Sequence, residues 1–203
     1  MKTLKLLGMI TLSVLVFQAC TGRNDSKAEA DSANMVKDTS TKPFLRTDST
    51  NVTPAHIEVD QHDAKFAVNA LADGMTEVAL GKLAQQKGTL AAVKDFGTMI
   101  VDDHNKIDQQ LETLGQKLRI ALPNALDNDG QKKVNELSAL SGHDFDKAYV
   151  NAMIEGHQRA TKAFEEAEKN VKDADLQPFA AKTILVIRKH LAAIEQIKKA
   201  NSF

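Results

Sequence analysis

From residue 64 to the C-terminus, apolar residues recur three and four positions apart, which is the spacing of one face of an α-helix. No stretch of this region shows the strict alternation of a half-buried strand. The pattern predicts four long helices that begin near residues 64, 90, 144 and 176. We therefore expect an all-α domain.

The lengths of the connections predict how these helices are joined. Only a few residues separate the first helix from the second and the third from the fourth, so each pair should form an antiparallel hairpin. Residues 119–143 form a much longer connection, with Pro123, the turn-like run 127–130 and a short helical segment near 131–140. Two antiparallel hairpins joined by a long crossover define a ferritin-like four-helix bundle, which is the architecture that we expect.

The N-terminus is typical of an export signal. Residues 1–19 combine Lys2 and Lys5 with an apolar stretch that is shorter than the ~20 residues needed to span a bilayer. Ala19 directly precedes Cys20, the only cysteine, and this arrangement resembles a bacterial lipoprotein signal in which the cysteine carries the lipid. We expect a lipoprotein of the bacterial cell envelope, facing the outer membrane or periplasm. The alternative is a plain secretory signal with an incidental cysteine.

Residues 20–62 are rich in Ser, Thr, Asp, Asn and Lys, and they show no sustained apolar period. This composition predicts a disordered tether between the lipidated cysteine and the folded part. The expected organisation is a signal peptide at 1–19, the lipidated Cys20 and tether at 20–62, and a four-helix bundle domain at 63–203.

Composition excludes several classes of function. The chain has 26 basic and 27 acidic residues, no Trp and 4% aromatic residues, so we expect no nucleic-acid partner. A single cysteine excludes a disulfide framework, an all-cysteine zinc site and covalently attached haem. No serine lies in a recognisable nucleophile turn, and we expect no catalytic residues of that kind.

Four polar residues interrupt the apolar faces of the predicted helices. His104, His157 and His190 each align with the apolar stripe of their own helix, and Glu77 lies beside a stripe of small residues on the first helix. Each lies near the midpoint of its helix. In a bundle of nearly equal helices, the four side chains should therefore meet in one layer.

Such a layer has three interpretations. Three imidazoles and one carboxylate can hold one divalent metal ion, either Zn²⁺ or, with an added water, Mn²⁺ or Fe²⁺. The same groups can form a closed hydrogen-bonded layer without metal. Noncovalent haem between two histidines is the third interpretation. Asp103, Asp146 and Tyr149 are candidates for the groups that support the layer from behind.

Several short segments resemble one known family, and they occur in order along the chain: Gly74–Glu77, Val101–His104, Phe145–Tyr149, Gly156–Gln158 and Lys189–Leu191. The sequence is similar to the DUF4142 family, uncharacterised bacterial envelope proteins grouped with the ferritin-like folds. The resemblance implies the fold, and by analogy it suggests di-iron chemistry. Di-iron bundles need a Glu three residues before a His on two helices. Here Val101, Ile154 and Ile187 take those positions, so ferroxidase activity is not expected.

Two functions remain. The first is a lipid-anchored envelope bundle that acts as a non-catalytic binding or stress-related accessory module. The alternative is a metalloprotein that holds one divalent metal in its core, with or without redox activity. The membrane, reached through the lipid, is the expected partner, and the sequence identifies no protein partner.

Overall fold

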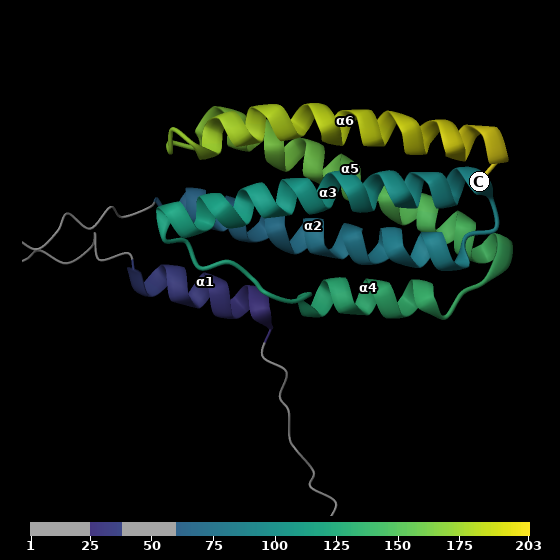
Figure 1. Cartoon of the computed structure of the whole chain (residues 1–203), viewed down its shortest axis with the longest axis horizontal. Helices are drawn as coiled ribbons and strands as arrows, with labels where there is room; N and C mark the ends of the chain where they lie inside the picture. Colours follow the sequence, from purple (N-terminus) through teal and green to yellow (C-terminus); the bar gives the residue numbers. More distant parts are fainter. Residues whose placement is uncertain (1–24, 38–59) are drawn as a thin grey trace, which may run out of the picture.

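The computed structural model describes residues 25–37 and 60–203, and these residues form helices and loops without any strand (Figure 1). The helices are α1 (Ser26–Lys37), α2 (Gln61–Lys87), α3 (Ala91–Leu118), α4 (Asn128–Ser138), α5 (Gly142–Asn170) and α6 (Leu176–Asn201). The predicted all-α class is confirmed for this part of the chain. None of these helices has the length and apolar character needed to cross a membrane.

The four predicted helices are α2, α3, α5 and α6, and each begins within a few residues of its expected start. Figure 1 shows α2 and α3 running in opposite directions, and α5 and α6 likewise. The connection from α3 to α5 passes along the molecule and contains α4, which lies along α2. The long crossover that the loop lengths predicted is therefore present.

A buried carboxylate from each helix pair holds the turn of the other pair. Asp146 on α5 accepts hydrogen bonds from the backbone N–H groups of Thr89 and Leu90, each at 3.0 Å, in the turn between α2 and α3. Asp63 on α2 accepts hydrogen bonds from the backbone of residues 172–173, in the turn between α5 and α6. Buried carboxylates need such partners, so these contacts fix how the two pairs align lengthwise.

The apolar core consists of two clusters. One contains Leu71, Leu111, Phe164 and Ile184 among its members, and the other contains Leu80, Phe96, Tyr149 and Ile194. Along each long helix, the residues of one cluster lie before the central polar residue and those of the other lie after it. The core is thus divided at the level where the polar layer was predicted.

The prediction of a disordered tether over 20–62 is wrong for residues 26–37, which form α1. The side-chain amide of Asn34 donates to the carbonyl of Ala121 and accepts from its N–H, at 2.9 and 2.8 Å. Ser26 Oγ donates to the carbonyl of Ala125 at 2.5 Å. These bonds fasten α1 to the crossover through polar groups, which an apolar period does not reveal. The expected signal peptide and Cys20 lie outside the described residues.

Candidate metal site

Three histidines from three helices meet in the core. The ring centroids of His104 on α3 and His157 on α5 are 5.9 Å apart, and each lies 5.4 Å from that of His190 on α6. His157 and His190 are fully buried, and His104 is 5% exposed. One nitrogen from each ring lies within 4.8 Å of the others, which is close enough for all three to bind one metal ion.

Glu77 on α2 completes this layer. Its Oε2 lies 3.0 Å from His104 Nε2, and its Oε1 lies 3.3 Å from His157 Nδ1. Burial alone would raise the pKa of Glu77, but the charges on the histidines, above all His104, outweigh burial and hold the pKa at about 2. The carboxylate is therefore ionised at neutral pH and spans two of the three imidazoles.

Two of the histidines are each oriented by a group that can only accept hydrogen bonds. His157 Nδ1 donates to the carbonyl oxygen of Met153 at 3.0 Å, and His190 Nε2 donates to Asp103 Oδ2 at 3.1 Å. The proton of each neutral ring must lie on the nitrogen that faces the acceptor. The lone pairs are then on His157 Nε2 and His190 Nδ1.

The remaining nitrogens provide the test of whether a metal fits. His104 Nε2, His157 Nε2 and His190 Nδ1 are buried without a hydrogen bond to any described residue. For His104, the 3.0 Å contact with Glu77 lies outside hydrogen-bond geometry. A buried nitrogen without a hydrogen bond is costly, and each of the three converging rings contributes one such nitrogen. The donor set fits a transition metal, with Asp103 and the Met153 carbonyl orienting two of the ligands.

Protonation also favours coordination. Burial lowers the pKa of His190 to about 4 and lowers the pKa of His157. Both rings are therefore neutral at pH 7, the form that binds metals. The pKa of His104 is raised, because Glu77 outweighs the effect of burial. Metal binding would displace the proton from that ring.

Of the three supporting candidates predicted from sequence, Asp103 contacts a histidine directly. Tyr149 lies beside the layer, because Phe96 packs edge-on against both Tyr149 and His157, with ring centroids 6.3 Å apart in each case. The Tyr149 hydroxyl is buried without a hydrogen bond to the described residues, and burial raises its pKa far above the usual range. Asp146 belongs to the α2–α3 turn instead, so its predicted supporting role is wrong.

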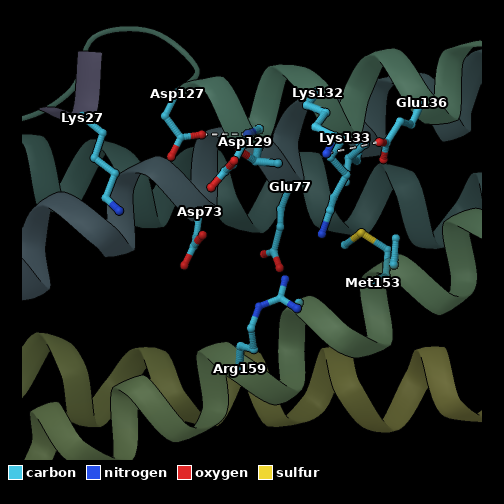
Figure 2. A pocket seen from close by; sticks show the side chains of 15 residues that line it. Lys27, Asp73, Glu77, Asp127, Asp129, Lys132, Lys133, Glu136, Met153 and Arg159 are labelled. Carbon is cyan, nitrogen blue, oxygen red and sulfur yellow. Dashed lines mark hydrogen bonds and ion pairs between the residues drawn. The ribbon is translucent and has the colours of Figure 1, made fainter. Parts of the chain in front are cut away.

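Two cavities reach the layer from outside, and Glu77 lines both. The first, of about 420 Å³, lies between α2, α4 and α5 beneath the end of α1, and its walls carry acidic and basic side chains (Figure 2). The second, of about 270 Å³, lies mainly between α2 and α5, is largely apolar and also exposes His104. Asp73 lines both cavities.

Two glycines make room for carboxylates in this region, and sequence reasoning assigned them no role. A Cβ at Gly156 would lie 3.1 Å from Glu77 Oε1, and one at Gly74 would lie 2.2 Å from Asp108 Oδ1. Asp108 is buried, and that oxygen has no hydrogen bond from the described residues. A signal was available, because both glycines end the same pattern, Val-Asn-Ala followed four residues later by Gly, at 68–74 and 150–156.

These features define an all-α protein of long packed helices with a buried three-histidine cluster. The chain belongs to the DUF4142 family, described as "Domain of unknown function (DUF4142)", whose model matches residues 49–197. The predicted family resemblance is confirmed. No curated protein matches the sequence.

Two solved structures share the fold. The first is the "Crystal structure of DUF305 fragment from Deinococcus radiodurans", 13% identical, with a TM-score of 0.61. The second is "CopM in the Cu(I)-bound form", 17% identical, with a TM-score of 0.59. Each match covers 68% of this chain and 96% of the other. At these identities the likeness establishes the helical fold alone.

Proposed function

We propose that this protein is a non-catalytic metal-binding module of the bacterial cell envelope, which holds one transition-metal ion through His104, His157 and His190. The observation that carries this proposal is the set of three converging imidazole nitrogens without hydrogen-bond partners. Glu77 would serve as the fourth ligand, because its carboxylate already contacts two of the rings. Zn²⁺, Mn²⁺ and Fe²⁺ are the divalent candidates.

Copper is a further candidate for a specific reason. A structural neighbour is described in a Cu(I)-bound form, and imidazole also suits copper among the first-row metals. A bound metal would contribute a fixed positive charge in the core and cross-link three helices. The protein's own residues hold the imidazoles of His157 and His190 neutral, orient both by hydrogen bonds and limit the access of bulk water through the apolar clusters on either side.

We also propose that the protein is anchored by lipid on Cys20 and faces the outer membrane or periplasm, as the lipoprotein-like signal favours. The antiparallel helix pairs and the long crossover support classification as a ferritin-like four-helix bundle. Haem is disfavoured, because Glu77 and a third histidine occupy the space beside any pair of histidines.

The test is thermal unfolding of metal-free protein with Zn²⁺, Cu⁺, Mn²⁺ and Fe²⁺. A ligand that binds only the folded state stabilises it by mass action, so Tm should rise with metal concentration. His104→Ala and His190→Ala should each remove the increase, whereas the exposed His62→Ala should keep it. If none of the four ions raises Tm, the histidines form a hydrogen-bonded layer and the metal proposal is wrong.

A further inference from the structure

We propose that the larger cavity, between α2, α4 and α5, is the entrance to the histidine cluster and that the Glu77 side chain is its gate. This inference rests on the metal site proposed above. It concerns how an ion reaches nitrogens that are almost completely buried, since His157 and His190 have no exposed surface. Some side chain must move aside for an ion to enter.

Glu77 is the side chain in the required position. It lines the cavity on one side and contacts His104 and His157 on the other. The Glu77 side chain therefore lies between the cavity and the histidine cluster. Figure 2 shows its carboxylate pointing toward the α5 side of the cavity, where Arg159 lies. An incoming cation that reaches this carboxylate can exchange solvent oxygens for carboxylate oxygens before it reaches the imidazoles.

The cavity has space for the carboxylate to turn. Gly156 on α5 lines the same cavity, and a Cβ there would lie only 3.1 Å from Glu77 Oε1. The absence of a side chain at this position leaves the carboxylate free on its cavity side. A methyl group would crowd the Glu77 carboxylate and leave it less room to turn.

The cavity also offers the carboxylate a second partner. Arg159, one turn beyond Gly156 on α5, points its guanidinium into the cavity toward Glu77 (Figure 2). An ionised carboxylate that leaves the histidines needs a new positive partner, and arginine can bind it through two hydrogen bonds. We infer two positions for Glu77, one on the histidines and one turned out toward Arg159.

The charges of the wall are consistent with passage of an ion. Asp73, Asp129 and Glu136 line the cavity together with Glu77. Basic side chains line it as well, among them Lys132, whose Nζ lies 3.9 Å from Glu136 Oε1. The smaller cavity reaches His104 along a mainly apolar wall that includes Phe66, Phe164 and Ile187. Ions shed their hydration shell at high cost against apolar surface, which favours the polar cavity as the entrance.

The experiment is stopped-flow uptake of Zn²⁺ by the full metal-free chain, purified without a histidine tag, with a chromophoric chelator as the reporter. Gly156→Ala should slow uptake by about tenfold, which corresponds to raising the barrier by about 1.4 kcal/mol. Arg159→Gln should also slow it. The stoichiometry of one ion per chain should be unchanged in both variants.

The sign of the Arg159→Gln effect separates gating from simple electrostatics, because loss of a positive charge should otherwise speed the approach of a cation. Lys132→Gln is the matched control, since it removes a charge from the same cavity, and we expect no slowing. Ala163→Val narrows the smaller cavity and should leave the rate unchanged. Circular dichroism checks that each variant folds. If Gly156→Ala does not fold, the Arg159→Gln variant still provides the test, because Arg159 is exposed.

Two results would overturn the proposal that ions enter through the larger cavity. One is uptake that is equally fast in Gly156→Ala and Arg159→Gln as in the unmodified chain. The other is slowing by Ala163→Val, which would assign entry to the smaller cavity. In both cases the unmodified chain still binds one ion, so the proposed gate is wrong but the proposed metal site is not. If the unmodified chain binds no ion at equilibrium, the proposed metal site itself is wrong, and the gate with it.

Discussion

Asp103 is the residue whose role can be tested most simply, because among the three histidines it is hydrogen-bonded to His190 only. Its hydrogen bond fixes the proton on His190 Nε2 and leaves Nδ1 for a metal. Asp103→Ala should lower metal affinity by about 10–100-fold, the usual effect of losing such a partner. Isothermal titration of the metal-free protein measures this. Asp102→Ala, at the exposed neighbouring position, should leave the metal affinity unchanged. Equal losses of affinity in the two variants would contradict the role of Asp103 in orienting His190.

Asp108 is expected to make stability depend on pH. Burial raises its pKa to about 7 in the folded protein, against 3.8 in an exposed chain. Between these values the folded state binds more protons than the unfolded state, so the free energy of unfolding falls as pH rises. Asp108→Asn should therefore gain on the order of 2 kcal/mol over the unmodified chain at pH 8, and nothing near pH 3.5.

Urea unfolding of metal-free protein at the two pH values gives this difference directly. Asp102→Asn on the same helix serves as the control, and its free energy of unfolding should differ little from that of the unmodified chain at both pH values. An Asp108→Asn protein that is less stable than the unmodified chain at pH 8 would show that the carboxylate has a partner that stabilises its charged form.

At the residue scale, helical phase predicted which side chains meet but not everything around them. Glu77 and the three histidines could be predicted because phase and axial position are both readable from a sequence. Asp146 has the right phase but lies 11 residues before His157, about 16 Å along the helix at 1.5 Å per residue. The repeated pattern at 68–74 and 150–156 marks Gly156, but its contact with Glu77 depends on the height at which another helix approaches, which the sequence does not give.

At the scale of elements, α1 tests how polar contacts hold a helix that has little apolar surface. Asn34 makes two hydrogen bonds to Ala121, and its replacement leaves both backbone groups of that residue without them. Asn34→Ala should release α1 at a cost of about 1–3 kcal/mol, seen as faster amide exchange over residues 26–37. In the control variant Ser32→Ala, on the exposed face, the amide exchange rates over residues 26–37 should match those of the unmodified chain. Unchanged exchange rates in Asn34→Ala would show that other contacts hold α1.

The long helices and α1 differ in how far the sequence predicts them. α3 and α5 carry sustained apolar stripes that bury into the core, so their positions follow from periodicity. α1 is rich in Ala, Ser and Lys and buries little. It packs along α2, and side-chain hydrogen bonds join it to an irregular segment 87 or more residues away. Such contacts carry no periodic signal.

At the scale of the whole molecule, the position of α1 changes what lipidation of Cys20 would do. Only five residues lie between Cys20 and Ser26, a reach of roughly 20 Å when fully extended at about 3.5 Å per residue. A lipid on Cys20 would therefore hold the docked domain close to the bilayer, rather than at the end of a 40-residue tether. The topology was predictable from connection lengths, but this closeness was not, because it depends on α1.

Cys20→Ser should move the protein from the membrane to the soluble fraction, since no described helix can span a bilayer. Fractionation of cells with immunodetection measures the distribution, and Thr21→Ser, a neighbouring conservative change, serves as the control. Retention of Cys20→Ser in the membrane would mean that another segment or a partner attaches the protein.

The central claim is that three converging histidine nitrogens without hydrogen bonds bind one metal ion. It is tested most directly by elemental analysis of the protein purified from its own cells without a histidine tag and without chelators. We predict about one transition-metal ion per chain, and loss of that ion in the His157→Ala variant while the helical content is kept. Native protein that contains no transition metal, and takes none up when Zn²⁺ or Cu⁺ is supplied, would contradict the claim.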